Sequence, residues 1–317
     1  MKRKILLTFN LWFILLPNPL PAQELAREAL ACFPNDTQQI AYVNLDQLRA
    51  LPNYHQLRRA IFSLQMQNFE EFLRSLGTDP EKDVNEIVVG WRGPVNDLSA
   101  LFGIAQGQFR PDQAQSYIAR EKLPFRQYEG FTLDAFGSGL GRDDTFFTFL
   151  SSDLAAFGRL SDLEAVVDGY LGNRVVLNSN SQFVNWEAEL EGSGPQWGIT
   201  TGRAAANLAV PLLLGESNQK IDLSSLLSPI RAVLYQVHWD TDFSTQIAVI
   251  CQDAQSAGTL SQLLNLWRVA VSKTNSKPAD VTQFIQRLEI QTDGNRIELE
   301  GSGPPDILSR LLHGTGP

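Results

Sequence analysis

IRAVLYQVHW at residues 230–239 and FSTQIAVIC at residues 243–251 are the segments that decide the fold. Each is rich in β-branched and aromatic residues, which favour strands, and each has the length of a strand. Residues 240–242 separate the two segments. We therefore predict two neighbouring antiparallel strands at the centre of a sheet.

Outward from this pair, the second part of the chain alternates helices with strands. Ser181 is a favourable N-cap for a helix that buries Phe183, Trp186 and Leu190. The other predicted elements of this part are strands at 196–201, 284–291 and 296–300 and helices at 204–214, 257–272 and 306–312.

The first part of the chain contains the same kinds of element. A strand at 39–45 precedes a long helical stretch that begins at Asp46 and ends at Gly77. The other predicted elements are strands at 86–91, 98–105, 125–128, 131–136, 145–150 and 154–157, a helix opened by Pro111, and a helix at 161–171.

The order of elements in the two parts indicates an internal duplication. Trp91 and Trp239 each end the first strand of a central pair, and LDAFGSG at 133–139 parallels IELEGSG at 297–303. We predict an α+β fold of two related units, each an antiparallel sheet covered by helices on one face. The first unit is expected at residues 23–172 and the second at 173–317.

One repeated heptapeptide does not fit this register. ELEGSGP occurs at residues 189–195 and again at 298–304. The first copy ends a predicted helix and the second ends a predicted strand, so either the match arises by chance among turn-rich residues or the proposed register of the two halves is wrong.

Residues 1–22 have the order of a secretory signal peptide. Lys2, Arg3 and Lys4 precede an apolar run at residues 5–16, which is shorter than the roughly 20 residues that cross a bilayer. Small Ala22 suits the position before the cleaved bond. We predict a bacterial protein whose mature chain has no transmembrane span and works outside the cytoplasm, in the periplasm or the medium.

The charge of the chain argues against nucleic acid as a partner. Cleavage of the leader removes three of the 26 basic residues and leaves 35 acidic ones, for a net charge of −12. Such a surface repels phosphate backbones. No basic stripe with interleaved aromatic residues offsets it.

The two cysteines, Cys32 and Cys251, leave two possibilities open. In an oxidising compartment they can form a disulfide, and closing so long a loop would contribute roughly 5 kcal/mol in the chain-entropy model. The other interpretation is a pair of buried free thiols.

The layout resembles uncharacterised secreted bacterial proteins in which duplicated α+β units follow a signal peptide. The resemblance rests on residues 145–201, where a strand pair, a helix at 161–172, a Ser-Asn-Ser stretch before Phe183, a second helix and a strand with Trp197 and Gly198 succeed one another. It implies the fold and secretion. It implies no catalytic residue, since those families have no assigned activity.

Candidate chemistry is sparse. Asp134, Asp143 and Asp144 flank the glycine-rich segment at 137–141 and can present carboxylates together, for acid–base chemistry or for calcium. The more common role of such residues is in a solvated hairpin turn. His238 near Asp240 can form half of an acid–base pair or be a plain strand residue. The spacing of His and Cys predicts no zinc site, and we expect no cofactor.

Trp91 and Trp239 are the best candidates for ligand contact, because residues at strand ends can be partly exposed. An exposed indole ring stacks on a sugar or buries a partner's apolar group. Burial in the core is the alternative for both side chains.

These observations favour a non-enzymatic extracytoplasmic protein that binds a protein, glycan or apolar ligand through the groove between its units. One alternative is a secreted hydrolase that uses the loop carboxylates with His238. Another is a carrier of lipid or other apolar molecules, which requires an enclosed apolar cavity.

Overall fold

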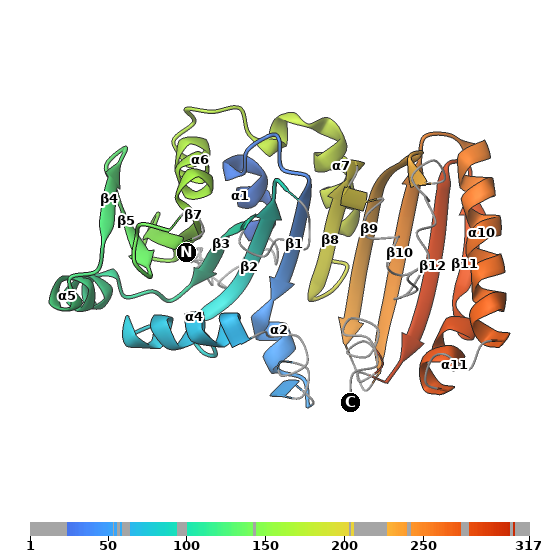
Figure 1. Cartoon of the computed structure of the whole chain (residues 1–317), viewed down its shortest axis with the longest axis horizontal. Coiled ribbons are helices and arrows are strands. Elements are labelled where there is room, and N and C mark those ends of the chain that lie inside the picture. The colour runs from blue at the N-terminus through green and yellow to red at the C-terminus, as the bar shows by residue number, and fades with distance from the viewer. Residues whose placement is uncertain are drawn as a thin grey trace, which may run out of the picture.

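The chain folds around one antiparallel sheet of twelve strands, in the order β11-β12-β10-β9-β8-β1-β2-β3-β7-β6-β5-β4 (Figure 1). This computed structural model describes residues 24–52, 54–55, 58, 64–93, 100–141, 144–202, 204–205, 227–239, 242–273, 279–304 and 307. The α+β class and the antiparallel pairing predicted from the sequence are confirmed. The predicted signal peptide and the predicted helices at 204–214 and 306–312 lie largely outside the described residues.

The strands are β1 (Gln39–Asn44), β2 (Val84–Trp91), β3 (Leu101–Gly107), β4 (Phe125–Tyr128), β5 (Phe131–Phe136), β6 (Thr145–Phe149), β7 (Leu154–Arg159), β8 (Gln196–Thr201), β9 (Ile230–Trp239), β10 (Phe243–Cys251), β11 (Glu289–Asp293) and β12 (Arg296–Gly303). The helices are α1 (Glu24–Cys32), α2 (Leu45–Arg49), α4 (Leu64–Ser75), α5 (Pro111–Glu121), α6 (Leu160–Tyr170), the 3-10 turn η2 (Leu177–Ser179), α7 (Ser181–Leu190), α10 (Ala254–Lys273) and α11 (Ala279–Arg287).

The two predicted units meet where β1 pairs with β8. Five residue pairs, from Gln39–Thr200 to Val43–Gln196, join these strands. The ladder continues at both ends, because the Asn44 amide donates to the Pro195 carbonyl at 2.7 Å and the Thr201 amide donates to the Gln38 carbonyl at 2.8 Å. The halves therefore share one sheet. We call the junction of β2, β1 and β8 the seam.

Helices cover both faces of the sheet in the first half. The face that carries Ile40 and Tyr42, here the α1 face, packs against α1, α6 and α7 in one large hydrophobic cluster. The opposite face, here the α10 face, packs Phe147 against α4 and α5 in the first half and Val249 against α10 in the second. The prediction of helices on a single face is therefore wrong for the first half. Strands buried on both sides need two covering layers.

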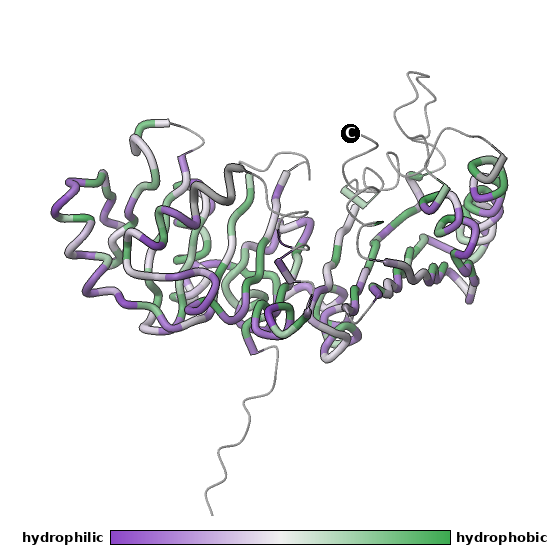
Figure 2. Tube along the Cα trace, turned by 90° about the horizontal axis from the view of Figure 1, so that it is seen from below, coloured by the Kyte–Doolittle hydropathy of each residue, from purple (hydrophilic) through white to green (hydrophobic). Residues whose placement is uncertain are grey.

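The α1 face changes from buried to polar across the seam. Ile104, Val88, Tyr42 and Trp197 occupy one cross-strand row on β3, β2, β1 and β8, and all four are buried. The same row continues through Gln236, Gln246, Glu300 and Glu289 on β9, β10, β12 and β11. Figure 2 shows α10 beside these outer strands on one side only. Polar side chains let the other side face solvent.

Two other elements differ from the sequence prediction. The segment at 284–291, predicted as a strand, is divided between α11 and β11. Val281, Phe284 and Ile285 are buried together on α11, the spacing of a helical face. The predicted helix from Asp46 to Gly77 is not continuous, since α2 ends at Arg49 and residues 51–52 are not helical. Pro52 has no amide hydrogen with which to continue a helix.

The two copies of the heptapeptide have different structures. Its first copy spans the end of α7 and the segment that leads into β8, and its second copy lies in β12 and the residue after it. The two copies lie close enough for Arg296 of β12 to pair with Glu189 of α7.

One buried carboxylate ties the end of β2 to the start of α6. Asp162 is 2% exposed, and it accepts hydrogen bonds from Nε of Arg92 and from Nε of Arg159, both at 3.0 Å. Arg92 also lies near Asp36, at 3.7 Å, and its guanidinium stands 5.9 Å from the centre of the Phe102 ring. The network holds α6 against the sheet.

Among the described helices, none is long and apolar enough to cross a membrane.

We expect Asp162→Ala to lower the free energy of unfolding by about 3 kcal/mol, because it leaves two partly buried guanidinium groups without their carboxylate. Urea unfolding followed by circular dichroism measures the change. Asp293→Ala, at an exposed edge position, is the control and should change stability by less than about 0.5 kcal/mol. Equal effects of the two substitutions would contradict this role of Asp162.

Candidate functional site

Both candidate tryptophans are buried. Trp91, at the end of β2, is 8% exposed and Trp239, at the end of β9, is 4% exposed. Trp239 donates from Nε1 to Oε1 of Gln196 at 3.4 Å and its ring lies 5.9 Å from that of Phe243. Neither tryptophan offers an exposed ring on which a ligand can stack.

The predicted carboxylates do not form a cluster. Asp134 lies on β5, where it is 6% exposed and faces α4 and α5, and its Oδ1 has no hydrogen-bond partner. Asp144 accepts from the Ser138 hydroxyl at 2.9 Å and from the Gly141 amide at 3.0 Å, which is the turn role that the sequence also allows. Asp143 lies outside the described residues.

His238 is far from these residues. It lies on β9, where its ring packs against Gly194 on the segment before β8. Seven strand spacings separate β9 from β5, a distance of about 34 Å at roughly 4.8 Å per strand. Asp240, its predicted partner, lies outside the described residues. The structure thus does not assemble the set that the hydrolase alternative requires.

The two cysteines are free thiols in separate hydrophobic clusters. Cys32 ends α1 on the α1 face, and Cys251 ends β10 on the α10 face. Burial raises the pKa of the Cys32 thiol to about 12, so it carries no thiolate character at neutral pH. The structure does not contain the disulfide that the sequence left open, because the sheet lies between the two side chains.

Metal-binding chemistry is also missing from the described part of the chain, which contains no group of three or more His, Cys, Asp or Glu side chains placed to hold an ion.

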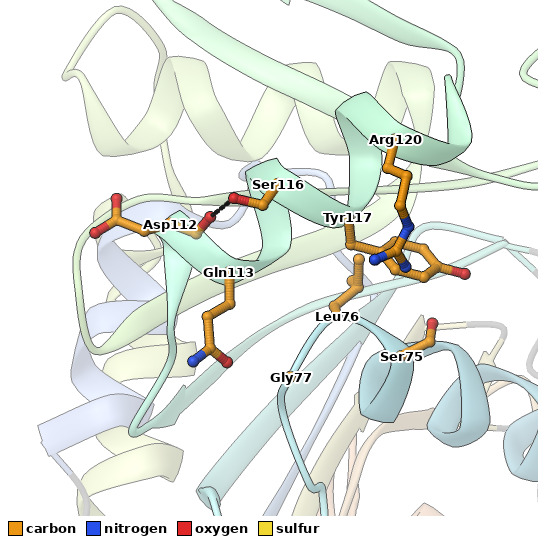
Figure 3. Close-up of a pocket in the computed structure, with 8 residues that line it drawn as sticks. All are labelled: Ser75, Leu76, Gly77, Asp112, Gln113, Ser116, Tyr117 and Arg120. Carbon is orange, nitrogen blue, oxygen red and sulfur yellow. Dashed lines mark hydrogen bonds between the residues drawn. The ribbon is translucent and has the colours of Figure 1, made fainter.

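A polar pocket lies between the end of α4 and the length of α5 (Figure 3). Its volume is about 360 Å³. The lining residues are Ser75, Leu76 and Gly77 from α4 and the turn after it, and Asp112, Gln113, Ser116, Tyr117 and Arg120 from α5. Buried Leu76 joins Phe147 and Ile118 in the hydrophobic cluster beneath.

The turn at Gly77 shapes this pocket. Gly77 has a φ of +86°, a conformation that strongly favours glycine, and it ends α4 as the sequence predicts. A Cβ at this position would also lie 2.5 Å from Oε1 of Gln113. The missing side chain therefore lets Gln113 reach down from α5 toward the end of α4 (Figure 3).

The side chains of α5 offer both hydrogen-bond donors and hydrogen-bond acceptors. The Ser116 hydroxyl donates to the backbone carbonyl of Asp112 at 2.8 Å, and the Asp112 carboxylate faces outward (Figure 3). Arg120 stands 5.1 Å from the centre of the Tyr117 ring and donates to Glu121 at 2.9 Å. The pocket thus combines one carboxylate, one guanidinium, an amide and hydroxyls above an apolar floor.

Sequence reasoning missed this pocket. Its α5 residues recur at positions 112–113, 116–117 and 120, the spacing of one helical face, beside buried Ala114 and Ile118. That periodicity was available in the sequence. The partner surface from the end of α4 was not, because it comes from 35 or more residues earlier in the chain.

A second feature lies at the seam, on its α1 face. Nδ2 of Asn44 donates to the Tyr42 hydroxyl at 3.3 Å and to Oε1 of Glu86 at 3.1 Å, while Oδ1 of Asn44 accepts from the Gln47 amide at 2.9 Å and caps α2. Burial raises the pKa of both Glu86 and Tyr42. The Trp197 ring stacks on that of Tyr42 at 5.3 Å. This network joins β1 to β2, to β8 and to the start of α2.

Fold and sites together define a mixed α+β protein built on a large antiparallel sheet. No protein-family model matches the chain, and no curated protein matches it. The chain is similar in structure to TP0453. Crystal form I of that protein gives a TM-score of 0.54 at 9% identity over 90% of this chain and 96% of that one. Crystal form III gives 0.52 at 10% identity over 90% and 97%. At this identity the likeness shows the fold alone.

We expect the stability contributed by Asp134 to depend on pH. Burial raises its pKa to about 6, above the unfolded value of about 3.9. The folded state therefore retains a proton that the unfolded state releases, and stability falls as pH rises from about 4 to 6. Asp134→Asn stays neutral at every pH. At pH 8 its free energy of unfolding should exceed that of the wild type by about 2 to 3 kcal/mol, whereas near pH 4 the two proteins should unfold at the same denaturant concentration.

Urea titrations at four or five pH values between 4 and 8 measure this difference. A constant difference between the two proteins over that range would show that Asp134 titrates normally. Asp144→Asn is the contrasting variant. Hydrogen bonds lower the pKa of Asp144, so this substitution should destabilise the protein most at neutral pH.

Proposed function

We propose that the chain is a non-enzymatic binding protein that works outside the cytoplasm, and that the α4–α5 pocket binds a neutral saccharide. The observation that carries this proposal is the composition of the pocket. Donors and acceptors surround a hollow of about 360 Å³ whose floor is apolar. Ligand pockets in general span about 300 to 1,000 Å³ and combine a few polar groups with apolar walls.

A saccharide fits this set of side chains because each of its hydroxyls both donates and accepts. Gln113 does the same through its amide, and Arg120 donates. One negative and one positive side chain line the pocket. A neutral ligand is therefore favoured over a strongly charged one.

Binding without turnover is favoured over hydrolysis for two reasons. Glycoside hydrolysis ordinarily uses two carboxyl groups on either side of the bond, whereas Asp112 is the one carboxylate among the lining residues. No histidine or cysteine lines the pocket as an alternative base or nucleophile. His238 lies in the other half of the sheet.

We also propose that the two halves are related by duplication. In the first half, β1, β2 and β3 run outward from the seam, a helix follows, and β4 to β7 return from the edge toward β3. In the second half, β8, β9 and β10 run outward, helices follow, and β11 and β12 return from the edge toward β10. The shared chain path supports the proposal; the first half has one additional hairpin.

Titration calorimetry with neutral oligosaccharides of two to four hexoses tests the proposed ligand. Gln113→Ala should weaken binding about two- to tenfold, the effect of one lost hydrogen bond, and Arg120→Gln should weaken it as well. Gln115→Ala is the matched control, since Gln115 is exposed on the same helix and does not line the pocket.

Two results would overturn this site. One is that no oligosaccharide of the panel binds. The other is that Gln113→Ala and Gln115→Ala bind a saccharide equally well.

The proposed export is tested separately. When the full chain is expressed in a bacterium, we expect the soluble extracytoplasmic fraction to contain a product that begins at Gln23 or Glu24, because cleavage follows the small residue Ala22. Intact mass spectrometry measures the N-terminus. Recovery of the uncleaved chain from the cytosol would contradict export.

A further inference from the structure

The seam carries a row of buried polar side chains on its α10 face. Eight residues on adjacent strands form this row: Leu101, Trp91, Gln39, Thr200, Val233, Val249, Ile297 and Thr292. The three at the seam, Trp91, Gln39 and Thr200, are 8%, 6% and 0% exposed. The four residues nearest to them in the row are aliphatic, and Thr292 at the edge of the sheet is exposed.

Each of the three polar side chains has a buried atom without a hydrogen-bond partner. These atoms are Nε1 of Trp91, Oε1 of Gln39 and Oγ1 of Thr200. Directly opposed residues of an antiparallel pair have Cβ atoms about 5 Å apart. Three unpaired groups from three different strands are therefore neighbours on one face of the sheet. Buried polar groups are nearly always paired in folded proteins, so such a concentration calls for a partner.

The three residues lie at one end of the sheet. Trp91 is the last residue of β2, Gln39 is the first of β1, and Thr200 is the last but one of β8. All three unpaired atoms are buried, so a ligand has to displace neighbouring side chains to meet them.

The chemistry of the three atoms defines the partner. The indole N–H of Trp91 donates only, Oε1 of Gln39 accepts only, and the Thr200 hydroxyl does both. A complementary group carries one acceptor and one donor. No charged residue occupies the row, so a neutral group is favoured.

We propose that the seam is a second binding site, separate from the α4–α5 pocket, and that it takes the neutral amide group of a peptide or of a small carboxamide. The amide carbonyl accepts from Nε1 of Trp91 and the amide N–H donates to Oε1 of Gln39. The Thr200 hydroxyl supplies a further bond to either atom. Val233 and Leu101 flank the amide with apolar surface.

Nuclear magnetic resonance of the indole N–H signals tests this site with acetamide and, in a second titration, with blocked trialanine. The Trp91 signal is the one that Trp91→Phe removes. We expect a saturable shift of this signal with at least one probe. N,N-Dimethylacetamide, which keeps the acceptor and lacks the donor, should bind at least threefold more weakly than acetamide.

Two controls make the test specific. Trp197 is the internal control, because it is fully buried on the opposite face of β8 with an unpaired Nε1, and its signal should not move. Thr200→Val keeps the shape of the side chain and removes the hydroxyl, so it should weaken binding two- to tenfold while the protein stays folded.

Tighter binding of trialanine than of acetamide identifies a peptide as the source of the amide, and the reverse order identifies a small carboxamide. The proposal is overturned if the Trp91 signal is unchanged by both probes, or if Thr200→Val leaves the affinity unchanged. Saccharide binding at the α4–α5 pocket is measured independently, so either site can fail without the other.

Discussion

Pairing of β1 with β8 is the constraint on which the rest of the structure depends. These strands lie more than 150 residues apart in the chain, and their ladder turns two groups of strands into one sheet. A backbone ladder has no freedom to slip where both faces are buried, because a shift by one residue would exchange the two faces. Ile40 and Tyr42 on one side and Gln39 on the other therefore fix the register of both halves.

This junction also concentrates the polar groups of the interior. Gln39, Thr200 and Trp91 on the α10 face, and Trp197 and Glu86 on the α1 face, each have a buried atom without a partner. A buried unpaired group costs about 1 to 3 kcal/mol. A junction that served only to join two halves would be more stable with aliphatic residues at these positions, as in the outer part of the same row. The amide site proposed above would supply partners for the three groups on the α10 face and leaves those on the α1 face unpaired.

The same strand order that builds the sheet separates the residues from which an active site was expected. Asp134 lies among aromatic side chains near one edge, Asp144 stabilises its own turn, and His238 packs against a glycine in the other half. The pocket between α4 and α5 arises instead from segments whose sequences carry no catalytic signature. One carboxylate and one guanidinium line it among uncharged groups.

The sequence by itself determined the class of fold and most of the strands, because β-branched and aromatic residues between turn residues specify strands locally. β4, β5, β8, β9 and β10 have the predicted bounds. It did not determine α11, because the apolar residues of its buried face, Val281, Phe284 and Ile285, also fit the short apolar run of a strand. Only the tertiary structure decided the pairing of β1 with β8, the second layer of helices, the separate burial of the cysteines, and the two sites. Each of these depends on contacts between distant segments, and local periodicity carries no information about which segments meet.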